Sequence, residues 1–375
     1  MKNIIVQCHA LNAIPLPILK NKWQKLYKNS NAHFFLSWRW VAPFCSQILT
    51  HKLKAHVFEA TLNGECIGLA IFVERTHMRH RVLTFKQLLL HKTGQETLDQ
   101  QWIEYNDFLL HRNYDESIRK AFWETINKEF PHIDEIIIGL SEKQTIKQHL
   151  KIIPDLTPWY FIESIGYEIH FPKNKLVNDY INSLSNNFRR QINKSNALLH
   201  EAGFHFNTST DIASAHKILH AIAPFHKTQW SHQSGFYNNE FNQYLTNVFE
   251  TTDDTSVFSA SFTNNNEIYA GLIGFIHNKH FYYYLSANKR FSDNKIRIGL
   301  SLHFEVIKWC IQHDIHCYDF LAGDYRYKRS FSNASREFGY CHLQRPTLAV
   351  QIERKGRALK QYLAARVSFL QSKDQ

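Results

Sequence analysis

The sequence has no long apolar run, little glycine and proline, and no paired cysteines. No stretch approaches the roughly 20 apolar residues that span a bilayer. The opening MKNIIVQCHALNAIPLPILKNKW is mildly apolar, but His9, Asn12 and two prolines interrupt it and no small-residue cleavage site follows. We therefore expect mature protein and not a signal peptide. The 13 glycines and 9 prolines among 375 residues exclude collagen-like and linker-type chains.

The six cysteines and 23 histidines do not form the spacings of a disulfide scaffold or a zinc site. No two cysteines make a C-x-x-C pair, so we expect small buried side chains in a reducing compartment. No H-E-x-x-H or similar ligand spacing is present, so we expect no metal. These features predict a cytoplasmic protein, with contact between basic residues and the inner membrane face as an open alternative.

Apolar residues and positive charge are both abundant. The hydrophobic fraction is 44% and the aromatic fraction 14%, which allows large packed cores and excludes a disordered chain. The length of 375 residues predicts two domains. The 44 Lys and Arg exceed the 33 Asp and Glu by 11. Nucleic acid, anionic lipid or a phosphorylated cofactor would each suit this charge, and so would a merely solvated surface.

The two halves of the chain repeat the same pattern. Residues 57–72 and 257–275 each open with Val-Phe-x-Ala, turn at Asn and Gly types and continue as a second apolar strand, which predicts two β-hairpins. Each hairpin is followed by an apolar helical stripe and a short apolar strand, so an internal duplication is predicted, with chance similarity as the alternative. Helices are predicted at 116–130, 176–200, 211–230, 237–250, 299–313 and 353–370, the last with an apolar stripe of Leu359, Leu363, Val367 and Leu370.

Residues 281–331 carry the strongest chemical signal. A β-prone run leads through the loop FSDNKIRIG into a helix, and a basic loop at a helix N-terminus can bind an anion through free backbone N–H groups. Lys295 and Arg297 add charge there, Gly299 permits close approach and Ser301 offers a hydroxyl. An ordinary helix start would look the same.

A polar cluster follows the next predicted strand. Asp319, Asp324, Tyr327 and Lys328 lie within ten residues, where α/β folds place reactive groups. Asp324 follows Gly323 in a turn, so it is either a functional carboxylate or a cap for backbone N–H groups. Two aromatic residues upstream are candidates for an acceptor site or for plain core: Trp230 and Tyr284.

The segment YDFLAGDYRYKRSF at 318–331 resembles the C-terminal signature of the GNAT-fold acetyltransferase domain family of the CelD and biotin-pathway-like type. In that family a helix is followed by D-F-L-x-G-D-x-x-Y-K, and the resemblance covers roughly residues 170–340. Its relatives, the FemAB-type aminoacyl transferases, carry two GNAT-like domains in one chain. The resemblance therefore implies an α/β (α+β) fold of two tandem GNAT-like domains, each a mixed, mostly antiparallel sheet flanked by helices. The expected domains are 1–165 and 166–375, with the active site in the second.

Two departures from the relatives are visible. Ser330 and Ser332 replace both glycines of the FemAB-type end motif, which favours the CelD-type relatives. The GNAT pyrophosphate motif is represented only by Arg297-Ile298-Gly299-Leu300-Ser301, which is one residue short.

The resemblance implies transfer of an acyl group from acetyl-CoA or another acyl-CoA to an amine on a small molecule or a glycan, in cell-envelope or polysaccharide metabolism. The expected oxyanion donors are backbone N–H groups at Leu285–Ala287. Asp324 or Asp319 is the expected base, and Tyr327 or Lys328 the expected donor to the leaving group. The residues expected at the cofactor are Leu285, Ser286, Ala287, Lys295, Arg297, Gly299, Leu300 and Ser301, and those at the acceptor are Trp230 and Tyr284.

Two other functions are consistent with the same residues. One is a FemAB-like transferase that uses aminoacyl-tRNA, for which the net charge would bind the tRNA. The other is a degenerate GNAT pair that binds a glycan or a protein without catalysis. DNA binding is not expected, because no helix-turn-helix or zinc-finger pattern is visible.

Overall fold

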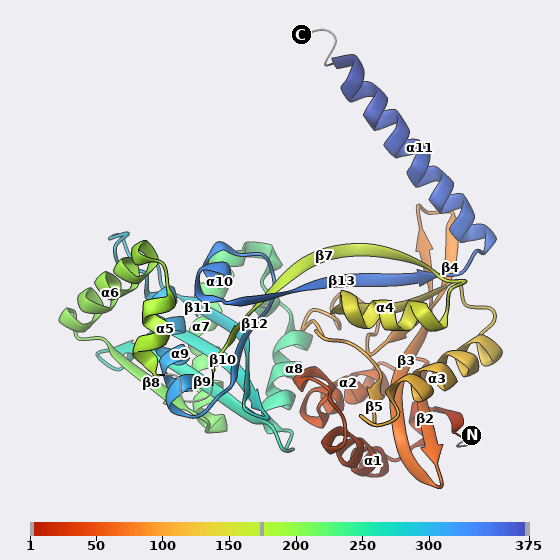
Figure 1. Cartoon of the computed structure of the whole chain (residues 1–375), viewed down its shortest axis with the longest axis horizontal. Coiled ribbons are helices and arrows are strands. Elements are labelled where there is room, and N and C mark those ends of the chain that lie inside the picture. The colour runs from red at the N-terminus through yellow and green to blue at the C-terminus, as the bar shows by residue number, and fades with distance from the viewer. Residues whose placement is uncertain (1–3, 173–175, 372–375) are drawn as a thin grey trace.

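The computed structural model describes residues 4–172 and 176–371 as an α/β protein with two lobes (Figure 1). The first lobe is built by the first half of the chain, from β1 to β6, and the second by residues from α5 to β12. Two long strands, β7 and β13, run between the lobes. The first-half elements are β1 (Ile5–Ala10), α1 (Leu16–Lys28), α2 (Trp38–Thr50), β2 (Ala55–Leu62), β3 (Glu65–Arg79), β4 (Leu83–Leu90), β5 (Leu109–Leu110), α3 (Asp115–Glu129), β6 (Glu135–Glu142), α4 (Lys143–Ile152) and β7 (Thr157–His170).

The second half repeats most of this order, with two helices added before its first strand and one after its last. Its elements are α5 (Val177–Ser183), α6 (Asn186–Glu201), β8 (His205–Ser209), α7 (Ile212–Trp230), α8 (Asn239–Glu250), β9 (Ser256–Asn264), β10 (Glu267–His277), β11 (His280–Asn288), α9 (Ile298–Gln312), β12 (Cys317–Ala322), α10 (Arg326–Phe331), β13 (Ala334–Gln344) and α11 (Leu348–Gln371).

One sheet passes through both lobes. Its strand order is β1-β2-β3-β4-β6-β13-β7-β12-β11-β10-β9-β8, with β5 paired to β3 off this path. All neighbours are antiparallel except β4 with β6 and β11 with β12, so the expected fold class of a mixed, mostly antiparallel sheet is confirmed. Both predicted hairpins and the helix and strand that follow each of them are also present.

The two central strands are exchanged between the halves. β13 comes from the end of the chain but pairs with first-half β6, and β7 pairs with second-half β12. The expected domain boundary at 165/166 falls inside β7. The division into two domains therefore stays a prediction.

The helix predicted over 176–200 is instead two helices. Leu184 has an extended backbone (ψ 148°), and the Ser185 hydroxyl accepts a hydrogen bond from Phe188 N at 3.4 Å as the N-cap of α6. Serine at this position satisfies an N–H group that a continuous helix would not leave free. The break turns α6 toward α9, and the Ser195 and Ser301 hydroxyls meet at 2.9 Å.

Arg39 joins the two halves at the back of the sheet. Its side chain is 5% exposed and donates to the carbonyls of Val248 and Phe249, at 3.1 and 2.9 Å. It also reaches Thr255 Oγ1 at 2.9 Å and the carboxylate of Asp253 at 3.4 Å. A buried guanidinium is stable only with such partners, so α2 and the end of α8 are held together.

We predict that Arg39→Ala lowers the free energy of unfolding by about 3–5 kcal/mol, because Asp253 is left as an uncompensated buried charge. Urea unfolding followed by circular dichroism measures the change. The matched control is Lys120→Ala, which removes the exposed ion pair with Glu124 and should leave the unfolding midpoint unchanged. Equal effects of the two substitutions would show that Arg39 does not hold the halves together.

Candidate functional site

The site begins where two parallel strands separate. β11 and β12 pair only between residues 280–282 and 317–319, and beyond these residues β11 has a free edge. A register shift between Ile273 and Gly274 on the partner strand marks a bulge in β11 at Tyr284. Leu321 near the end of β12 has a positive φ of 60°, which a non-glycine residue adopts at a cost. The strands therefore open into a V at the level of Tyr283 and Phe320.

A cavity of about 870 Å³ lies along this free edge and extends to the N-terminus of α9. We call it the α9 cleft. Gly299 lets the helix approach closely, since a Cβ there would lie 2.8 Å from the Asn288 side-chain oxygen. Among the described residues that line the cleft no side chain is acidic, whereas four are cationic: Lys289, Arg290, Arg297 and Arg326. Together with the N–H groups of the α9 N-terminus they favour an anionic ligand.

A second cavity, of about 1100 Å³, lies between the lobes. We call it the inter-lobe cleft. Its walls come from both halves of the chain and combine aromatic rings with charges of both signs. The two cavities meet at seven residues that line both: His226, Trp230, Tyr283, Tyr284, Leu285, Tyr325 and Tyr327.

Glu104 and Lys328 stand where the cavities meet, and both hold the end of β12. Glu104 Oε2 accepts from the backbone N–H of Ala322 at 2.8 Å, while Lys328 Nζ donates to the carbonyl of the same residue at 2.7 Å. Both line the inter-lobe cleft. Burial raises the pKa of Glu104 to about 7, although the charge of Lys328 opposes this shift. Burial likewise lowers the pKa of Lys328, against the attraction of Glu104 and Asp319.

Tyr327 faces both cavities from α10. Burial, with Tyr283 as its hydrogen-bonding neighbour, raises the pKa of Tyr327 well above its ordinary value, so the hydroxyl keeps its proton at neutral pH. His226 also lies at the junction, and its Nδ1 forms a hydrogen bond of 2.8 Å with the Ser234 hydroxyl. Burial lowers the pKa of His226 to about 4, so it is neutral. The junction thus offers a proton donor and, in Glu104, a proton acceptor near neutrality.

Most residues expected at the site lie on these cavities. Trp230, Tyr284, Leu285 and Tyr327 line both, and Lys328 lines the inter-lobe cleft. Ser286, Arg297, Gly299 and Leu300 line the α9 cleft. Three expected cofactor residues line neither cavity: Ala287, which is buried, Lys295, which points to solvent, and Ser301, which is bonded to Ser195.

Asp319 is buried where β12 pairs with β7, opposite Glu168. Its fully buried carboxylate accepts from the Tyr105 hydroxyl at 2.5 Å and from Leu321 N at 2.7 Å, with His280 Nε2 at 3.4 Å. Glu168, His280 and Asp319 bring ligand atoms within 4.8 Å of one another, a spacing that could hold a metal ion. Arg336 already supplies positive charge to Glu168 at 2.8 Å.

Asp324 lies on the surface of the loop before α10. Its carboxylate accepts from Tyr167 at 2.7 Å and pairs with Arg329 at 2.7 Å. These bonds hold the pKa of Asp324 below its ordinary value. Neither Asp319 nor Asp324 lines either cavity, and their catalytic role stays a prediction.

Sequence reasoning missed Glu104. It lies 218 residues before Ala322, in the segment WIEYNDF of the first half. A single glutamate between Ile103 and Tyr105 gives no local signal, and only the packing of the halves brings it to β12.

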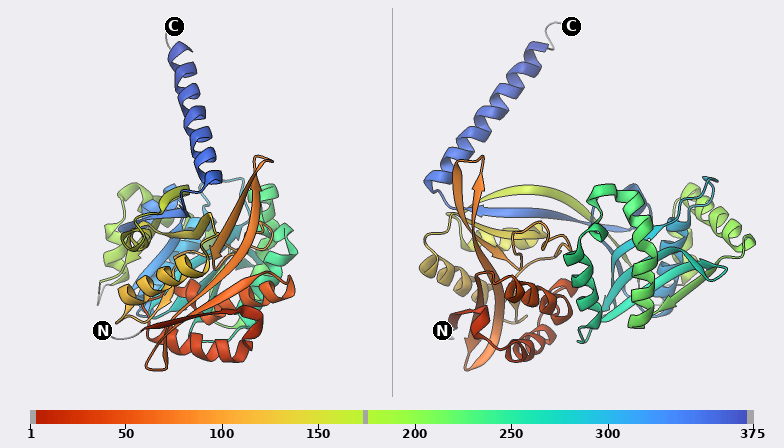
Figure 2. Two further views of the ribbon diagram at one scale, coloured as in Figure 1. Left: turned by 90° about the vertical axis from the view of Figure 1, so that its right-hand side faces the viewer. Right: turned by 180° about the vertical axis from the view of Figure 1, so that it is seen from behind.

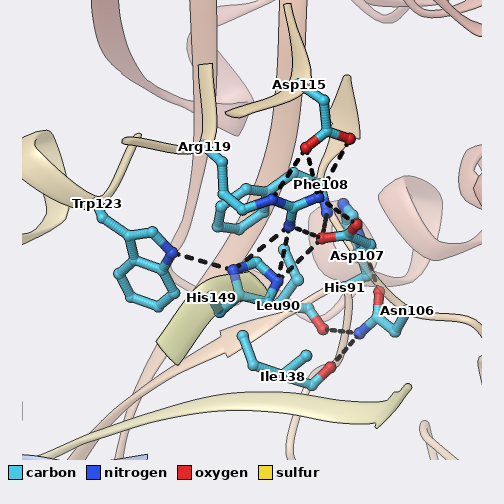
Figure 3. Close-up of polar contacts among 10 residues, drawn as sticks. All are labelled: Leu90, His91, Asn106, Asp107, Phe108, Asp115, Arg119, Trp123, Ile138 and His149. Carbon is cyan, nitrogen blue, oxygen red and sulfur yellow. Dashed lines mark hydrogen bonds and ion pairs between the residues drawn. The ribbon is translucent and has the colours of Figure 1, made fainter. Parts of the chain in front are cut away.

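The same segment closes the equivalent opening in the first half (Figure 3). β4 and β6 are parallel only between residues 87–89 and 135–137 and then separate, as β11 and β12 do. There the Asn106 Nδ2 donates to the carbonyls of Leu90 at 2.8 Å and Ile138 at 2.6 Å and bridges the two strands. Asn106 has no exposed surface, so this opening is filled by the protein itself.

A charged cluster completes the closure. Asp107 receives bonds from the Arg119 guanidinium, one of them at 2.8 Å, and lies 3.0 Å from His149 Nε2 (Figure 3). Trp123 Nε1 donates to the other His149 nitrogen at 3.0 Å, and Asp115 pairs with Arg119 at 3.1 Å. Burial alone would raise the pKa of Asp107, but Arg119 and His149 outweigh it and hold this pKa well below its ordinary value.

Known proteins resemble this chain in part of its sequence and in its fold. Residues 183–329 match the family described as Acetyltransferase (GNAT) domain. This stretch of the second half, from the end of α5 to α10, resembles a GNAT domain. The crystal structure of FemX superimposes with a TM-score of 0.55 at 11% identity, covering 86% of this chain and 95% of FemX. A conserved protein of unknown function from Bacteroides thetaiotaomicron gives 0.52 at 11% identity, covering 92% of this chain and all of that one (100%).

These structural likenesses concern the fold, which is thus GNAT-like and shared with FemX over most of the chain. The search of curated proteins gives no match. Of the helices that the structure describes, none has the length and apolarity to cross a membrane.

We predict that Asp107→Asn destabilises the protein at neutral pH and that its deficit shrinks in acid. Because the folded-state pKa of Asp107 is depressed, its charged contacts contribute stability above the unfolded-state pKa of about 4, and this is lost as the pH falls further. Unfolding free energies from urea titrations at several pH values measure the gap between variant and wild type. A gap that stays constant down to the acid limit would contradict the assignment.

Proposed function

We propose that the protein is an N-acyltransferase that moves an acyl group from an acyl-CoA thioester, such as acetyl-CoA, to an amine acceptor. One observation carries this proposal: a cation-lined cleft at the free edge of β11 meets a larger mixed cleft beside a proton acceptor and a proton donor. The GNAT match of residues 183–329 supports the same reaction class.

The α9 cleft fits the thioester. Its four cations and the α9 N-terminus suit the phosphates, although the loop is one residue shorter than the usual pyrophosphate motif. The free edge of β11 beyond Tyr282 offers backbone N–H groups to a pantetheine arm and to the acyl oxygen at Leu285–Ala287. No acidic side chain is among the described residues that line the α9 cleft, so none would repel the phosphates.

The inter-lobe cleft fits the amine. The amine nitrogen forms a bond to the acyl carbon while the carbon–sulfur bond breaks, so one proton must leave the nitrogen and one must reach the sulfur. Glu104 takes the first and the Tyr327 hydroxyl gives the second. Lys328 positions the end of β12 through the Ala322 carbonyl and so holds Glu104 at the junction.

Aromatic rings set the class of acceptor. Trp102, Trp159, Phe161 and Tyr340 line the inter-lobe cleft away from the junction, and rings of this kind suit the apolar face of a sugar. A small-molecule or glycan amine in cell-envelope or polysaccharide metabolism is therefore the proposed acceptor. The likeness to FemX keeps aminoacyl-tRNA as the alternative acyl donor to be tested.

Glu104 is the base of the proposed reaction. With wild-type protein, kcat/KM should rise with pH and level off above about 7, because Glu104 must lose its proton to act. Glu104→Gln should lower kcat/KM by about a hundredfold or more and abolish this limb. Glu96→Gln, in the same cleft, should retain both the rate and the profile. A Glu104→Gln enzyme that keeps the limb would assign the base elsewhere.

The cations of the α9 cleft bind the phosphates of the proposed acyl donor. Acetyl-CoA should raise the melting temperature of the wild type, and Lys289→Glu with Arg297→Glu should remove most of this shift, since the phosphates lose two of the four cations. Lys295→Glu, outside the cleft, should leave it nearly intact. Stabilisation by charged tRNA but by no CoA ester would overturn the acyl-CoA assignment in favour of the aminoacyl-tRNA alternative.

A further inference from the structure

The last helix, α11, extends from the body of the molecule as a free rod (Figures 1 and 2). Its first turns are anchored: Val350 is fully buried, and Glu353 is 5% exposed. Leu348 in the first turn is nevertheless 75% exposed, and further along the helix Leu359 and Leu363 are 59 and 51% exposed. The 3.6-residue repeat places these leucines on one side of the helix, together with Ile352 at 47%. The predicted stripe is therefore present and uncovered as far as Leu363, while the side chains of Val367 and Leu370 lie outside the described residues.

The polar part of α11 is cationic. Between residues 348 and 363 it carries four cations and one carboxylate, Glu353. That carboxylate is already paired, with Arg79 at 2.9 Å and with Arg357 at 3.0 Å. The cations are Arg354, Lys355, Arg357 and Lys360.

A second exposed apolar element lies beside the base of α11. It is the turn between β3 and β4, which reaches out from the same edge of the body (Figure 2). Met78 and Val82 there are 62 and 77% exposed. His80 and Arg81 between them are exposed, and both have a positive φ, of 53° and 62°. Few residues other than glycine and asparagine adopt this conformation readily. Glu353 ties this turn to α11 through Arg79.

We propose that α11 and the β3–β4 turn form one docking surface for an anionic lipid membrane. Exposed leucines on one side and cations around them are what lets a helix lie in the interface, with its apolar side in the acyl region and its cations at lipid phosphates. Charge complementarity selects this occupant: Lys355, Lys360 and Arg81 are exposed cations, whereas the one carboxylate between residues 348 and 363 is paired with Arg79 and Arg357.

The position of Lys355 favours a membrane over a second copy of the chain as the occupant of this surface. Lys355 lies on the leucine side of α11, between Ile352 and Leu359. In a helix–helix seam its ammonium would be buried without a partner, whereas at a membrane a long lysine side chain reaches the headgroups. Packing of α11 against the same helix of a second copy would, moreover, leave the β3–β4 turn without a role.

Sedimentation of the full-length protein with vesicles tests the proposal. Binding should be strong to vesicles of phosphatidylcholine mixed with phosphatidylglycerol, weak to phosphatidylcholine alone, and should fall with added salt. Leu359→Glu with Leu363→Glu should reduce the bound fraction more than tenfold, since each buried leucine contributes roughly tenfold in partition. Val82→Asp should reduce it in the same direction.

Ala358→Glu is the control for Leu359→Glu, because it adds the same charge one residue away and off the stripe. It should bind far better than Leu359→Glu. Equal binding of the two variants, or no preference for the anionic vesicles, would overturn the proposal. A wild-type mass by light scattering twice that of the Leu359→Glu variant would instead assign the stripe to a second copy. Acyl transfer to a water-soluble amine should be equal in both variants, so the result does not depend on the proposed reaction.

Discussion

The site depends on the end of one strand. The peptide groups of Ala322 are fixed between Glu104, which accepts from the backbone N–H, and Lys328, which donates to the carbonyl. The bulge at Tyr284 and the positive φ of Leu321 separate β12 from β11 after three paired residues, so the β11 edge is left for a ligand. Burial of Glu104 raises its pKa to about 7, although the Ala322 N–H and the charge of Lys328 oppose the shift, so Glu104 can act as a base near neutrality. The strand end and the environment of Glu104 thus meet at one residue, Ala322.

The comparison between the halves supports this account. Both halves have a hairpin, a parallel strand pair that separates, and a helix beside the opening. In the first half Asn106 bridges the separated strands, and Asp107, Arg119 and His149 fill the space behind it. The segment that fills the first opening is the one that sends Glu104 into the second. The segment that contains Asn106 therefore closes the first opening, whereas the second stays open to a ligand. The exchanged strands β7 and β13 join the two halves.

Sequence patterns predicted what depends on neighbours along the chain. The hairpins, the helices at 116–130 and 299–313, and the lining residues Tyr327 and Lys328 follow from periodicity and from a ten-residue motif. The strand exchange has no local signature, because β13 is an ordinary strand until its partners are known. Glu104 has none either, since it acts across the interface. Asp319 and Asp324 were expected to be reactive because strand ends often carry chemistry. Asp319 accepts a bond from Tyr105 and Asp324 accepts one from Arg329, so each carboxylate also has structural contacts.

The central claim is that the second-half opening alone takes an acyl-CoA while the first is closed by the protein. Calorimetric titration of the full-length protein with acetyl-CoA measures this directly, because it gives the number of sites. We predict one acetyl-CoA per chain, with the same single site retained when Asp107 is changed to Asn. Two equivalents per chain would show that the first-half opening also binds, and no binding of any CoA ester would contradict the account.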